Sequence, residues 1–150
     1  MATRRATSAG RGTEASFRPF FLLAAVYDGL LGAGFLFFAG PIYAALGAPP
    51  PADPVYLRLI AAFVAVQGLG YAFVWRDPAR NAAVVAIGAV YKAAYVAVAL
   101  LALGEGDLPH VAFAWFAATD ALFLAGFLRF LRVAAVPGGA AVPGSTAGGA

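Results

Sequence analysis

Four polar side chains stand alone inside long apolar stretches of the sequence. They are Asp28, Gln67, Lys92 and Asp120, one in each of four stretches. Inside a membrane, a charge that faces lipid costs roughly 2.5–3.5 kcal/mol, so charged residues there turn inward and pair. We therefore expect Lys92 to lie between Asp28 and Asp120, with Gln67 filling the remaining hydrogen-bond positions.

The same four residues are predicted to lie at one depth. Each is nine to twelve residues from an arginine at one end of its stretch; these arginines are Arg18, Arg76, Arg80 and Arg129. At about 1.5 Å of helix rise per residue, the separation is about 13–18 Å. Because the hydrocarbon core of a bilayer is about 30 Å thick, all four side chains fall near its midplane.

Three tyrosines accompany this group. Tyr27, Tyr71 and Tyr95 each lie within one helical turn of one of the four polar residues. Their phenols are suited to completing the hydrogen-bond network or lining a cavity. Two aspartates around one lysine also leave a net charge of −1, so either one carboxyl is protonated or a cationic ligand supplies the missing charge.

Several functions fit such a buried cluster. The first is the binding of a hydrophobic or amphipathic small ligand, lipid-like or quinone-like, or the relay of protons. The alternative is a non-catalytic accessory or structural subunit of a larger membrane complex, in which the charges only fix how the helices pack. The least favoured is an enzyme with Asp28 or Asp120 as proton donor and Tyr95 nearby, and the sequence identifies no catalytic residue.

The elements that must position these residues follow from the composition. Of the 150 residues, 63% are hydrophobic and 11% charged, and the mean hydropathy is +0.84. Stretches 20–38, 55–75, 82–103 and 111–131 are long enough to span a bilayer. We predict an all-α, integral membrane four-helix bundle over residues 17–133. The basic segment 1–16 and the Gly/Ala/Pro-rich segment 134–150 are predicted to be disordered tails.

The distribution of charge predicts the orientation. Three segments are expected on one side of the membrane: the one before the first span, the link from the second span to the third, and the end of the fourth. Together they carry eight arginines against Glu14 and Asp77, which gives a net charge of +6. The opposite side has a net charge of −2. Positive loops mark the cytoplasmic face, so both termini are expected in the cytoplasm and the protein in the cytoplasmic (inner) membrane. The excess of arginine then indicates how the protein is oriented in the lipid bilayer and does not indicate a nucleic-acid-binding surface.

Other chemistries are excluded or disfavoured. The chain has no cysteine, so disulfides, thiolate metal sites and thiol chemistry are absent. The single histidine, His110, lies near Glu105 and Asp107, but such loop acids are usually solvated. We predict no metal site and no cofactor.

Proline and acidic residues mark the expected helix boundaries. Asp53-Pro54 and Asp77-Pro78 each place a capping carboxylate before a proline suited to a first helical turn. In the longer, apolar connection 39–54, residues 41–47 are expected to form a short interfacial helix over one end of the bundle. This helix is either a lid over a pocket or a passive connector.

The sequence resembles small four-span bacterial membrane proteins of the DoxX-like kind over residues 20–132. The likeness is carried by "YDGLLGAGF" from Tyr27, "RNAAVVAIGAVYKAAY" from Arg80 and "TDALFLAGFLRFLR" from Thr119. It implies a four-helix bundle in the cytoplasmic membrane, in some cases accompanying redox enzymes. The layout is also similar to eukaryotic four-span sterol-binding and sterol-isomerising proteins, where acidic residues line a hydrophobic ligand cavity; no residue-level motif transfers from them.

Overall fold

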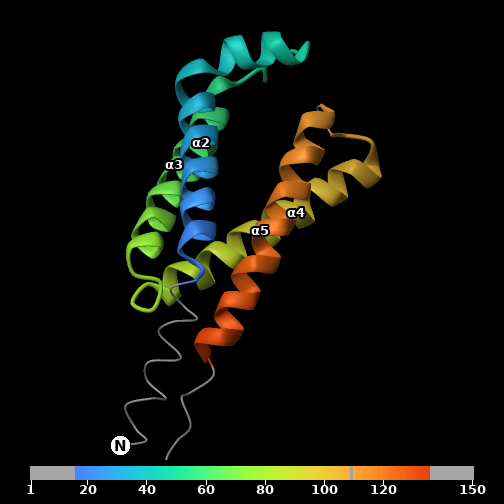
Figure 1. The fold of residues 1–150 in the computed structure, drawn as a ribbon. Coiled ribbons are helices and arrows are strands. Elements are labelled where there is room, and N and C mark those ends of the chain that lie inside the picture. Colours follow the sequence, from blue (N-terminus) through green and yellow to red (C-terminus); the bar gives the residue numbers. More distant parts are fainter. Residues whose placement is uncertain (1–15, 109, 136–150) are drawn as a thin grey trace, which may run out of the picture.

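The computed structural model describes residues 16–108 and 110–135, which form four helices and no strand. The helices are α2 (Arg18–Leu46), α3 (Pro54–Arg76), α4 (Ala82–Glu105) and α5 (Val111–Ala135) (Figure 1). Each is long and apolar enough to cross a membrane. The prediction of an all-α protein with four candidate spans is confirmed. Helix α5 extends two residues into the predicted C-terminal tail, and the rest of both predicted tails lies outside the described residues.

The four helices are arranged as two hairpins. Helix α2 packs closely along α3, and α4 packs along α5, whereas α3 with α4 and α2 with α5 touch only over short segments. The two hairpins come together near the start of α2 and diverge toward the opposite end (Figure 1). The short link 77–81 therefore joins α3 to α4 without making them close partners, contrary to the packing expected of consecutive helices.

We call the end that holds Arg18, Arg76 and Arg132 the basic end, and the end that holds Asp53 and Glu105 the acidic end. At the basic end, aromatic rings from both hairpins pack together. Edge-to-face pairs are formed by Phe21 with Phe130, at 5.0 Å between centroids, and by Tyr71 with Phe127, at 4.9 Å. Their mutual packing joins the two hairpins there.

Small residues bring α2 and α3 together. A methyl group added at Gly32 would collide with the backbone of Ala61 and Ala65, and one added at Gly68 would collide with the backbone of Gly29. This is the close helix approach that small residues permit in membrane proteins. On α4, Gly88 makes room for the ring of Tyr71.

Helix α2 contains a kink near the acidic end. Phe38 has non-helical angles (φ −128°, ψ 27°), and Pro41 follows within the helix. Proline lacks the N–H that would bond to the carbonyl four residues earlier, so the helix breaks before it. The piece after the kink turns away from the first (Figure 1) and packs Tyr43 against Phe35. The predicted short helix at 41–47 is therefore present up to Leu46.

The predicted helix starts are confirmed in one case and wrong in the other. The Asp53 carboxylate accepts a hydrogen bond from the Val55 N–H at 2.9 Å and caps α3. Asp77 instead accepts from the Arg80 N–H at 3.2 Å and stabilises a turn in the link, because α4 begins only at Ala82.

The outward faces of the helices are apolar. Leu122 is 75% exposed, Phe37 72% and Val90 72%, and they belong to three different helices. Contiguous apolar surface of this extent is not stable in water, and it suits contact with lipid acyl chains.

Candidate functional site

The predicted charge cluster is present at the centre of the helices. The ammonium Nζ of Lys92 on α4 lies 2.9 and 3.0 Å from the two carboxylate oxygens of Asp28 on α2. It lies 2.6 Å from Oδ1 of Asp120 on α5. Asp28 and Lys92 are 1% exposed and Asp120 is 6% exposed. The cluster therefore links the two hairpins through buried ion pairs, as the sequence predicted.

The hydrogen-bond capacity of the cluster is unevenly used. The ammonium of Lys92 contacts three carboxylate oxygens, and two of them belong to the single carboxylate of Asp28. Both oxygens of Asp28 receive a hydrogen bond. Oδ2 of Asp120 receives none from the part of the chain that the structure describes. Asp120 therefore keeps a free acceptor.

Aromatic rings surround the ammonium. The ring centroids of Tyr27, Tyr71, Tyr91 and Phe123 all lie 5.4–5.9 Å from Nζ. At this range the electron-rich face of a ring attracts a cation. These rings replace part of the hydration that Lys92 loses on burial.

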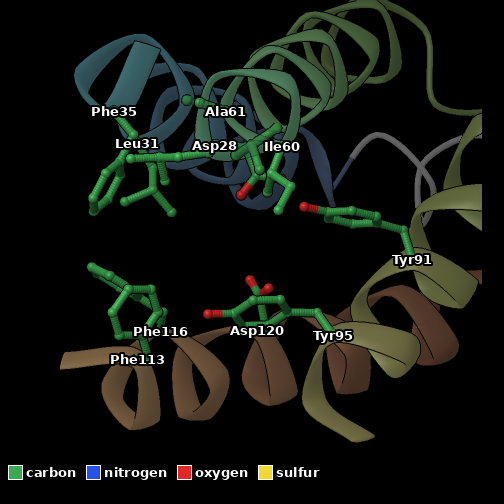
Figure 2. A pocket seen from close by; sticks show the side chains of 13 residues that line it. Asp28, Leu31, Phe35, Ile60, Ala61, Tyr91, Tyr95, Phe113, Phe116 and Asp120 are labelled. Carbon is green, nitrogen blue, oxygen red and sulfur yellow. The ribbon is translucent and has the colours of Figure 1, made fainter. Parts of the chain in front are cut away.

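A cleft opens from the cluster toward the acidic end, between the two hairpins. Its cavity volume is about 80 Å³, below the roughly 300–1,000 Å³ that small-molecule sites occupy, so a ligand would lie partly in the open side of the cleft. Thirteen residues from all four helices line it. Figure 2 shows Asp28, Leu31 and Phe35 on one wall and Asp120 and Phe116 on the other.

The cleft has a polar end and an apolar end. At the polar end, Tyr91 and Tyr95 line the cleft with Asp28 and Asp120; the Tyr91 hydroxyl is directed into the cleft and that of Tyr95 toward Phe116 (Figure 2). At the apolar end the lining is formed by Leu31, Phe35, Leu57, Phe113 and Phe116. The shape and polarity match an elongated molecule with one polar group.

Gln67 is not part of the cluster, and this prediction was wrong. Its side chain forms no hydrogen bond with Asp28, Lys92 or Asp120 and lines a separate groove with Ile60, Phe63, Val66 and Tyr91. The position of Gln67 was predicted from its distance along the helix alone. The direction of its side chain around α3 was predicted wrongly. The next residue, Gly68, faces α2, and one residue corresponds to about 100° of helix rotation.

The three predicted tyrosines divide into two groups. Tyr95 lines the cleft. Tyr27 and Tyr71 lie beside Lys92 instead, and their buried hydroxyls have no hydrogen-bond partner within the described ranges. Thr119 lies beside Tyr27, but its hydroxyl donates to the Trp115 carbonyl at 2.9 Å.

Tyr91 was missed as a cleft residue. It precedes Lys92 directly in the sequence, and neighbours on a helix point about 100° apart, so adjacency argued against a shared site. The signal available was the spacing of Tyr91 and Tyr95, four residues apart and hence on one helix face.

His110 has a structural role. Its Nδ1 accepts a hydrogen bond from the Ala112 N–H at 3.1 Å at the start of α5. Within residues 16–108 and 110–135, no three acidic or histidine side chains are grouped as metal ligands. No family model, curated protein or solved structure matches the chain, so its site is interpreted from its own geometry.

Proposed function

We propose that this protein binds a hydrophobic or amphipathic small molecule within the membrane, in the cleft between its two hairpins. The observation that carries the proposal is the position of a buried ion cluster with one free carboxylate oxygen at the inner end of an otherwise apolar cleft. The apolar body of the ligand would lie against Phe35, Phe113 and Phe116, and its polar group would reach Asp120.

The asymmetry of the site favours binding over proton relay. Toward the acidic end, the cluster opens into the cleft. Toward the basic end, it is followed by the fully buried side chains of Phe21, Val74, Val85 and Phe130. A proton path needs a continuous chain of polar groups or water, and these apolar side chains interrupt one.

The orientation proposed for the molecule places both termini in the cytoplasm and the protein in the cytoplasmic membrane, on the strength of the arginine distribution. The cleft would then open within the outer half of the bilayer. We also retain the DoxX-like resemblance as a proposal, supported by four helices of spanning length.

The experiment uses neighbouring leucines on α2. Leu31 lines the cleft, whereas Leu30 is 70% exposed on the outer surface. The protein and its Leu31→Trp and Leu30→Trp variants are purified from membranes in a mild detergent, and the bound small molecules are extracted and identified by mass spectrometry. We expect the unmodified protein and Leu30→Trp to retain a molecule that Leu31→Trp has lost, because the indole fills the cleft.

Equal recovery of small molecules from all three proteins would contradict binding in the cleft. Recovery of none from any of them, with a larger membrane protein co-purifying in stoichiometric amount, would favour the accessory-subunit alternative instead. Circular dichroism and gel filtration of both variants serve to confirm that they are folded.

A further inference from the structure

The charges of the cluster do not balance. Asp28 and Asp120 face the single ammonium of Lys92, which contacts both oxygens of Asp28 and one oxygen of Asp120. Among the described residues, no further lysine, arginine or histidine lines the cleft. With both carboxyl groups ionised, one negative charge stays uncompensated in a region of low dielectric constant, where an unpaired charge is strongly unfavourable.

The excess charge is exposed only toward the cleft. Asp120 is buried to more than nine-tenths, and its Oδ1 is occupied by Lys92. Its Oδ2 has no donor in residues 16–108 and 110–135, and the carboxylate faces the cleft in Figure 2. Asp120 Oδ2 is open to the cleft, so a ligand that brings a donor can pair with it on binding.

The groups beside Asp120 suit a cation. Tyr91 and Tyr95 line the cleft together with Asp120, and their hydroxyls can accept hydrogen bonds. Oδ2 of Asp120 is the acceptor that would pair with the positive charge of the ligand. The aromatic walls provided by Phe35, Phe113 and Phe116 are suited to an alkyl or aryl body.

We propose that the ligand of this cleft is a hydrophobic amine, bound as its cation with the nitrogen at Asp120. This inference rests on the proposed binding function and specifies the chemical class of the ligand. With Lys92 Nζ 2.6 Å from its Oδ1, an ionised Asp120 still has Oδ2 to accept from a ligand cation. A protonated Asp120 would present a donor and take a carbonyl compound instead.

The test uses the absence of cysteine from the chain. A cysteine introduced as Leu31→Cys lies in the cleft, and one introduced as Leu30→Cys lies on the outer surface as a control. Alkylation of each by a maleimide is followed in detergent with nonylamine, 1-nonanol or 2-nonanone. Each measurement is repeated in the Asp120→Asn background, which preserves side-chain shape and removes the charge.

We expect nonylamine to protect the cysteine of Leu31→Cys at about ten- to a hundredfold lower concentration than 1-nonanol, the factor that a charged hydrogen bond provides. Asp120→Asn should abolish this difference, and the Leu30→Cys control should be protected by none of the three. Comparison of one probe in two proteins cancels its partition into micelles.

The outcomes separate the two proposals. Equal protection by the amine and the alcohol, or preference for the ketone, would overturn the amine assignment and leave the binding function intact. Absence of protection by every probe would overturn both. If Asp120→Asn fails to fold, the comparison of amine with alcohol in the Leu31→Cys protein decides the assignment once the partition of each probe into micelles has been measured and corrected for.

Discussion

At the scale of single residues, the buried ion cluster was predictable because its energetics allow few arrangements. Three ionisable side chains near one depth must meet if each is to avoid lipid, and Lys92 does contact both Asp28 and Asp120. Gln67 carries no charge, so a lipid-facing position costs it less. The sequence therefore limits the possible contacts of Gln67 less, and the structure places Gln67 in a different groove.

The charge balance predicts that the lysine matters more for stability than either aspartate. Lys92→Met would leave two carboxylates with no counter-ion, at a cost of roughly 3–5 kcal/mol, the usual cost of breaking a buried pair. Asp120→Asn would leave the Asp28–Lys92 pair in place and balanced. We expect Lys92→Met to unfold at a markedly lower concentration of a denaturing detergent than Asp120→Asn does. Circular dichroism would follow the unfolding.

A triple variant provides the control for this comparison. Asp28→Asn, Lys92→Met and Asp120→Asn together remove every charge of the cluster, and we expect them to recover most of the stability that Lys92→Met alone has lost. Equal stability of Lys92→Met and Asp120→Asn would show that the stability of the protein does not depend on the balance of charge in the cluster.

At the scale of helices, the boundaries were more predictable than the pairing. The cap at Asp53 and the spans themselves follow from local sequence. The close pairing of α2 with α3 depends on which faces hold Gly32 and Gly68, and that is settled by fit between two helices rather than by either alone. Local patterns also misplaced Asp77, because a carboxylate before proline can cap a turn as well as a helix.

Two glycines on α2 distinguish packing from helix propensity. Gly32→Ala would bring a methyl group into the backbone of α3, whereas Gly29→Ala meets no atom within 4 Å. We expect Gly32→Ala to destabilise the protein by about 1–3 kcal/mol. Gly29→Ala should be neutral or stabilising by up to about 1 kcal/mol, since alanine favours helix. Thermal unfolding of the two variants in detergent would measure the difference.

A destabilised Gly29→Ala together with an unaffected Gly32→Ala would mean that the glycine contacts of α2 do not determine its pairing with α3.

At the scale of the whole molecule, the span count was predictable and the divergence of the hairpins was not. Hydropathy predicts where a helix crosses a membrane, and four such helices are found. It contains no information on the distance between two hairpins. The cleft lies beyond the large ring cluster that joins the hairpins at the basic end, and toward the acidic end Phe35 and Phe116 pack across it with their centroids 6.2 Å apart. The resemblance to DoxX-like proteins stays a prediction.

The proposed orientation can be checked with two exposed loop positions in the cysteine-free chain. Ala79 lies in the link at the basic end, and Ala52 lies in the connection at the acidic end. In intact cells, a membrane-impermeant maleimide should label the cysteine of Ala52→Cys, and should label that of Ala79→Cys only after the membrane is permeabilised.

The opposite labelling pattern would invert the orientation and place the opening of the cleft in the inner half of the bilayer. Labelling of both positions in intact cells would contradict the four-span topology.

The separation of the two hairpins along the chain has a consequence for biogenesis. Asp28 and Lys92 are 64 residues apart and belong to different hairpins, whereas Lys92 and Asp120 are 28 residues apart in the same one. A ribosome completes α2 and α3 well before it makes Lys92. The first half of the nascent protein therefore contains Asp28 without its lysine partner until the second half is made. A translation product that ends before Lys92 keeps the Asp28 carboxyl group without that counter-ion.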